Sequence, residues 1–142
     1  MQTKWIGAAA ALLVFAGGYA SAKTLHFATL LKGADEVPAN TTKGSGKVTA
    51  SLDTTTKNFT YQVTYKGLTG AATMAHFHGP AAAGANAPPI VAVPAGALAS
   101  PMKGAQVLTD AQITDLEAGK WYFNIHTAAN PGGEVRGQVA AK

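Results

Sequence analysis

Three histidines are the side chains of this sequence best suited to chemistry. His76 and His78 lie two positions apart in the run His-Phe-His, and His126 closes the later run 121–126. Side chains two positions apart on a strand point to the same face, roughly 7 Å from each other. Two imidazoles at that spacing can bind one ion, and a third can join them from a second strand. The pattern therefore predicts a metal site formed by His76, His78 and His126.

The donor atoms indicate which ion such a site would hold. Imidazole suits copper, zinc, nickel and iron, and the chain contains no cysteine to act as a thiolate ligand. Neither histidine run contains a carboxylate. We therefore expect copper, with zinc as the alternative. A site with three protein ligands keeps an open position where water or a small oxidant can bind.

Several nearby residues bear on this hypothesis. Met74 points to the same face of the predicted strand as His76 and His78, and we expect its side chain to pack against neighbours rather than to bind metal. His26 is interpreted as a surface histidine. Glu134 and Arg136 lie two positions apart, and one of them could orient an imidazole or steer an anion into the site. The alternatives are a surface salt bridge worth at most about 1 kcal/mol, or pairing of Arg136 with the carboxylates at Asp35 and Glu36.

Composition narrows the classes of function. The chain has 142 residues, a formal net charge of +4 and no cysteine, which is enough length for one domain and excludes disulfides and thiol chemistry. Its lysines are scattered and it has a single arginine, Arg136, so we expect no nucleic-acid binding. No serine–histidine–aspartate order and no glycine-rich nucleotide turn is present.

Residues 1–22 have the pattern of a secretory signal peptide. Lys4 precedes an apolar run over 6–15, and Ala20-Ser21-Ala22 matches a cleavage site. The apolar run is shorter than the roughly 20 residues that span a bilayer. We therefore expect a mature protein over 23–142 that is periplasmic or secreted and has no membrane span after cleavage.

Most of the mature sequence shows the alternation and the turn composition of short strands. We expect an all-β fold, an antiparallel Greek-key-like sandwich or barrel of about seven or eight strands with one short helix. The helix is predicted over 109–118, with Thr109 and Gln112 as a capping box. The segment 79–89 is a long loop of alanine, glycine and proline, and loops of this length are often functional.

Alternation also predicts the orientation of the histidine strands. Phe77 on the first strand, and Trp121 and Phe123 on the second, occupy the faces that most naturally point into the core. The histidines would then lie on the outer face or near strand ends, where a loop can cover them. If the two strands pair, the three imidazoles meet in one patch.

A set of longer motifs suggests a family. They are Gly33–Pro38, the hairpin Leu52–Tyr65, Ala75–Pro80, Leu108–Asp110, Leu116–Gly119, and Tyr122–Thr127 followed by Asn130–Gly137. Together they make residues from about 25 to 139 resemble the CHRD domain, which is named after chordin and is also found alone in bacterial exported proteins. The resemblance implies one exported domain over 23–142 and says little about its activity.

The histidine pattern and the late Gly-x-x-Arg, Gly133 to Arg136, are also similar to the copper face of Cu/Zn superoxide dismutase. The chain lacks that enzyme's disulfide and its zinc-loop ligands, so the similarity implies copper alone. It suggests copper handling or redox chemistry of the superoxide kind, with Arg136 steering superoxide or another small anion. Whether the site is catalytic stays open. The alternative is an adhesion or protein-interaction module without metal; a zinc hydrolase ranks last, because no general base is evident.

Overall fold

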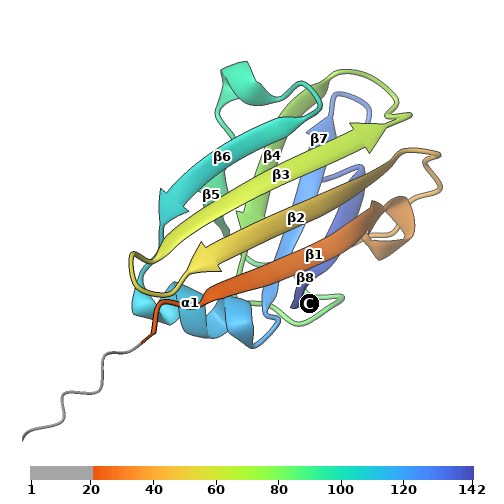
Figure 1. The fold of residues 1–142 in the computed structure, drawn as a ribbon. Coiled ribbons are helices and arrows are strands. Elements are labelled where there is room, and N and C mark those ends of the chain that lie inside the picture. Colours follow the sequence, from red (N-terminus) through yellow and green to blue (C-terminus); the bar gives the residue numbers. More distant parts are fainter. Residues whose placement is uncertain (1–20) are drawn as a thin grey trace, which may run out of the picture.

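The computed structural model describes residues 21–142, so the predicted leader at 1–22 lies outside the described residues except for its last two. Eight antiparallel strands form one sheet that curls into a nearly closed barrel, accompanied by one α-helix (Figure 1). This confirms the predicted all-β fold. The elements are β1 (Thr24–Lys32), β2 (Ser45–Asp53), β3 (Asn58–Lys66), β4 (Ala72–His78), β5 (Pro89–Ala92), β6 (Met102–Val107), α1 (Asp110–Glu117), β7 (Trp121–Thr127) and β8 (Val135–Ala141), with short 3-10 turns at Gly33–Asp35 and Ala95–Ala97.

The strands run across the sheet in the order β5-β4-β7-β8-β1-β2-β3-β6. In Figure 1, β1, β2, β3 and β6 form the front layer, and β4, β5, β7 and β8 lie behind them. The chain crosses between the layers after β3, after β5 and again after β6. As a result β4 and β7 become neighbours, although 42 residues separate the last residue of β4, His78, from the first residue of β7, Trp121. This arrangement brings the two histidine strands together.

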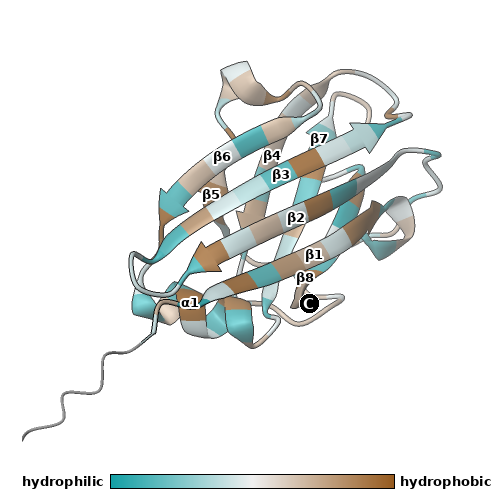
Figure 2. Cartoon of the chain, viewed as in Figure 1, coloured by the Kyte–Doolittle hydropathy of each residue, from teal (hydrophilic) through white to brown (hydrophobic). Residues whose placement is uncertain are grey.

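The core fills the space between the layers. Along β2 and β3 apolar residues alternate with polar ones, which Figure 2 shows as alternating bands. The inward positions are buried, and the ring of Phe59 meets the rings of Phe77 and Trp121 edge to face, with 5.2 Å between the centroids of Phe59 and Phe77. Burying each such side chain contributes about 1.5–3 kcal/mol. The apolar faces of both histidine strands therefore point inward, as alternation predicts.

The helix α1 forms where the sequence predicts it. Thr109 is the N-cap, its Oγ1 accepts a hydrogen bond from the Gln112 backbone at 3.2 Å, and the Gln112 side chain accepts one from the Thr109 backbone at 2.9 Å. Leu116 is fully buried in the core. Gly119 ends the helix with a φ of 69°, a conformation that suits glycine. Among residues 21–142, no helix has the length and apolar character needed to cross a membrane.

The pairing of β4 with β7 sets the register of the candidate site. Met74 lies opposite His126, His76 opposite Asn124, and Phe77 opposite Phe123. Because Phe77 and Phe123 face the core, the histidines of both strands lie on the outer side of this layer. The two histidine strands therefore pair, which is the condition under which the sequence pattern brings the three imidazoles into one patch.

Candidate metal centre

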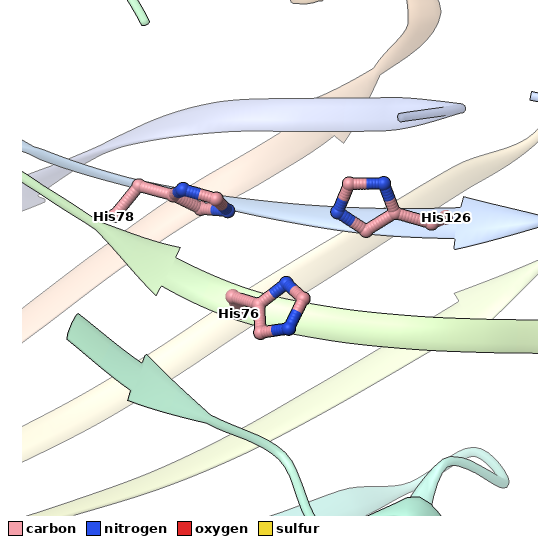
Figure 3. Close-up of side chains that lie close together, drawn as sticks. All are labelled: His76, His78 and His126. Atoms are coloured by element: carbon pink, nitrogen blue, oxygen red, sulfur yellow. The ribbon is translucent and has the colours of Figure 1, made fainter. Parts of the chain in front are cut away.

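The three imidazoles form one cluster on the outer face of β4 and β7 (Figure 3). The ring centroid of His76 lies 5.4 Å from that of His78 and 5.4 Å from that of His126. One nitrogen from each ring lies within 4.8 Å of the other two. Bonds of about 2.0–2.1 Å place three nitrogens spread around one ion about 3.3–3.6 Å apart. Ring rotations that move each nitrogen by up to about 0.7 Å would therefore close the site around a cation.

In two of the rings, a hydrogen bond to the backbone determines which nitrogen faces the cluster and can bind an ion. Nδ1 of His126 lies 2.9 Å from the carbonyl oxygen of Pro131, and Nδ1 of His78 lies 2.9 Å from that of Ala87. A carbonyl oxygen only accepts, so Nδ1 of His126 donates and its lone pair is left on Nε2. Nδ1 of His78 donates in the same way in the tautomer that leaves its Nε2 available to an ion. Carbonyl partners commonly fix metal-binding histidines in this way.

Two ring nitrogens of the cluster are buried and have no hydrogen-bond partner among residues 21–142. They are Nδ1 of His76 and Nε2 of His126. Buried polar atoms are nearly always paired, because leaving one unpaired costs about 1–3 kcal/mol. A cation bound between the rings would give both atoms a partner, so the donor set fits a metal ion.

The third nitrogen that an ion would need, Nε2 of His78, already contacts another side chain. It lies 3.0 Å from the side-chain oxygen of Asn124, which is itself buried. An ion could use this nitrogen only after the contact with Asn124 opens. Asn124 is a residue of the site that the sequence analysis did not identify; its place beside the histidines depends on the β4–β7 register.

Burial makes the rings good ligands near neutral pH. His78 and His126 are 8% and 7% exposed, and His76 is partly buried. Burial lowers the pKa of His76, and the nearby His126 and His78 lower it further. Burial also lowers the pKa of His78, against the raising effect of its hydrogen bonds to Ala87 and Asn124. Neutral imidazole is the form that binds metal.

The long loop predicted over 79–89 covers one side of the cluster, and Arg136 holds it. The guanidinium donates to the side-chain oxygen of Asn86 at 2.8 Å and to the carbonyl oxygen of Ala85. It also lies 3.5 Å above the ring of Tyr122, which stacks on His78 at 4.6 Å with an interplanar angle of 2°. Arg136 is thus a buried neighbour of the site, and its positive charge contributes to the lowered pKa of His78.

The proposed surface salt bridge between Glu134 and Arg136 is wrong, because both side chains are buried, with 0% and 2% exposed. The carboxylate of Glu134 instead accepts hydrogen bonds of 2.6 Å from the hydroxyls of Thr42, Thr69 and Thr127, and one of 2.9 Å from the Thr69 backbone. Burial alone would raise the pKa of Glu134, but these bonds outweigh it and lower the pKa to about 2. The carboxylate therefore ties two loops to the end of β7, next to His126.

Glu36 lies on the other side of Asn124 and is 5% exposed. Burial raises its pKa to about 7, although the charge of Arg136 and a hydrogen bond from Asn124 act in the opposite direction. The backbone of Gly133 makes room for it: a Cβ there would lie 2.4 Å from Oε1 of Glu36. Glu36 and Arg136 interact through space but form no ion pair.

The other two residues singled out from the sequence lie at the surface. Met74 is 46% exposed and stands opposite His126 in the register. His26 is exposed on β1, opposite Ser51 of β2 and in the other layer of the barrel. His26 is therefore separate from the three-histidine cluster, as predicted.

Comparison with known proteins places the chain in a family. The family model described as the CHRD domain matches residues 27–139. No curated protein and no solved structure gave a significant match.

Proposed function

The chain belongs to the CHRD domain family, and we propose that its function is to bind one copper ion through His76, His78 and His126. The observation that carries this proposal is the pair of buried, unpartnered ring nitrogens on His76 and His126. They lie beside a third imidazole whose other nitrogen is already anchored to a carbonyl. Copper suits an all-imidazole site because it stands highest among first-row divalent ions in affinity for nitrogen ligands, with zinc as the alternative.

The proposal includes export and a role in copper handling or in redox chemistry of the superoxide kind. When bound, copper would supply a one-electron redox centre with a position open to a small anion. The chain's own contribution is to hold three imidazole rings on two strands and to place the charge of Arg136 close by. That charge favours the approach of an anion such as superoxide. Export rests on the leader pattern over 1–22, and a mature N-terminus at Lys23 would support it.

Metal titration with matched variants tests the proposal. The protein is titrated with copper and with zinc in competition with a chelator of known affinity, alongside His76→Ala, His78→Ala and His126→Ala. His26→Ala is the control, because this histidine is exposed in the other layer. We expect one ion per chain, a loss of at least tenfold in affinity for each cluster variant and no change for the control. Binding that is micromolar or weaker and indifferent to the cluster variants would contradict the proposal.

A metal-free interaction module is the second candidate. The observation that favours it is that both ring nitrogens of His78 lie within hydrogen-bonding distance of protein oxygens, and a neutral ring can donate to one of them without an ion. Capture of a partner from an envelope extract separates the two candidates. A specific partner retained equally by a variant lacking all three cluster histidines, together with the absence of metal binding, would support the module.

A further inference from the structure

The outer face of β1, β2 and β3 carries a basic patch that the metal site does not use. The register places Leu30, Lys47 and Thr64 side by side in one row. The neighbouring row contains Lys32, Ser45 and Lys66. These strands form the front layer of Figure 1, whereas the histidine strands β4 and β7 belong to the layer behind. We call these six residues the lysine face.

The charges on the lysine face are unbalanced. Lys32, Lys47 and Lys66 are all exposed, and neither row contains a carboxylate. Among residues 21–142, the ion pair that forms joins Lys57 to Asp110, outside this face. Strands lie about 4.8 Å apart, so the backbones of Lys32 and Lys66 are about 10 Å apart, with Lys47 between and beside them. Three ammonium groups therefore share a small area with no internal counter-charge.

The lysine face also has an apolar part. Leu30, at the β1 corner of the face, is 58% exposed. Beside it lies an open hollow of about 340 Å³ between the two rows, with walls that include Leu30, the three lysines and Thr64. Lysine stems line such surfaces with their methylenes while the ammonium groups stay in water. The face thus combines an exposed leucine and the hollow beside it with three ammonium groups.

We propose that the lysine face docks on the surface of a bilayer that contains anionic phospholipid. The three ammonium groups pair with lipid phosphates, and Leu30 enters the boundary between headgroups and acyl chains. Charge complementarity selects the anionic lipid, and the exposed leucine distinguishes a bilayer from a purely polar polyanion. Nucleic acid is a poorer candidate partner. The lysine ammonium groups are point charges, and the face has no arginine whose guanidinium could bind a phosphate through two parallel hydrogen bonds. This proposal does not depend on metal binding.

Co-sedimentation with vesicles tests the docking. The protein is used from Lys23, because all strands and the helix follow that residue, and the apolar run over 6–15 would itself enter a bilayer. Vesicles of phosphatidylcholine alone are compared with vesicles containing about one-third phosphatidylglycerol. We expect binding only to the anionic vesicles and its loss near 1 M salt, where the screening length is about 3 Å. Absence of binding to anionic vesicles at low salt would overturn the proposal.

Matched variants test whether the lysine face is the surface that binds the vesicles. Replacing Lys32, Lys47 and Lys66 by glutamate should weaken vesicle binding at least a hundredfold, since each lysine is worth about fivefold near an anionic surface. Changing the exposed Lys23, Lys120 and Lys142 to glutamate alters the net charge equally and should cost far less. Equal losses in the two triple variants would show attraction by net charge alone and overturn the assignment.

The variant Leu30→Ser separates insertion of the leucine into the bilayer from purely electrostatic attraction to its surface. It leaves every charge in place and should weaken binding to anionic vesicles severalfold while keeping the salt dependence. A soluble alkyl phosphate below its micelle concentration is the second probe. If it binds the unaltered face while vesicles do not, the face is a site for a free amphiphile and the bilayer proposal is overturned. Circular dichroism of each variant confirms the fold before the binding data are interpreted.

Discussion

The side-chain oxygen of Asn124 lies 3.0 Å from Nε2 of His78, the nitrogen that a bound ion would need. The other nitrogen of the same ring faces the carbonyl oxygen of Ala87 at 2.9 Å. A neutral imidazole has one N–H, so it can donate to only one of these two acceptors. A cation at Nε2 would resolve this conflict, because Nδ1 could then donate to Ala87 while Nε2 binds the ion.

Replacing Asn124 should therefore strengthen metal binding. In Asn124→Ala, the contact that competes for Nε2 of His78 is gone, and a net hydrogen bond is worth about 1 kcal/mol. We expect an affinity for copper about fivefold higher in chelator competition. Asn58→Ala on β3 is the control and should leave the affinity unchanged. A weaker affinity in Asn124→Ala would mean that Asn124 supports the ion rather than competing with it.

Metal affinity should depend on pH in a defined direction. Burial lowers the pKa of His76 and of His78, so protons begin to compete with the ion only below the usual histidine value of about 6.5. We expect a constant affinity from pH 8 to about 6.5, then a fall of up to about tenfold per unit for each ring that must lose a proton. Competition with a chelator at each pH value measures the affinity for copper. A steady fall that begins above pH 7 would contradict the assignment of ligands.

Glu134 should stabilise the fold at neutral pH. Its folded pKa of about 2 lies below the ordinary value of 4.5, so its contribution is complete above pH 4.5 and is lost as the pH falls toward 2. The shift corresponds to about 3 kcal/mol of the free energy of unfolding. Urea unfolding of Glu134→Gln at pH 7 should show a loss of that order, shrinking in acid. Glu117→Gln on the exposed side of α1 is the control, and an equally small loss in both variants would contradict this role.

Glu36 should have the opposite effect on stability. Its folded pKa of about 7 lies above 4.5, so the folded state is increasingly penalised as the pH rises from 4.5 through 7. Glu36→Gln removes this penalty. Relative to the unaltered protein, its free energy of unfolding should improve by about 3 kcal/mol between pH 5 and pH 8. Urea unfolding at the two pH values measures the change, and a difference that does not vary with pH would show that Glu36 is ionised throughout.

Much of the fold follows from local patterns. Alternation along β2 and β3 predicts their pairing and their buried faces, and the Thr109–Gln112 capping box predicts α1. These signals are local because the interacting residues are close in the chain. The sequence leaves the neighbour of β4 open, since the pairing with β7 depends on two crossings between the layers.

The histidines of the site could be predicted, but their surroundings could not. Residue type and spacing are enough to single out His76, His78 and His126. The role of Glu134 depends on hydroxyls from three separate segments, and no spacing rule predicts such a meeting. For the same reason the sequence leaves the role of Arg136 open among several alternatives, whereas in the structure the loop over 79–89 folds back and buries it.

Anomalous diffraction from crystals grown with one equivalent of copper tests the central claim most directly. We predict a single peak at the copper edge, about 2 Å from Nδ1 of His76 and from Nε2 of both His78 and His126. The side chain of Asn124 should have turned away from His78 in the same crystals. A peak elsewhere, for example at His26, or no peak at full occupancy of added copper, would contradict the account.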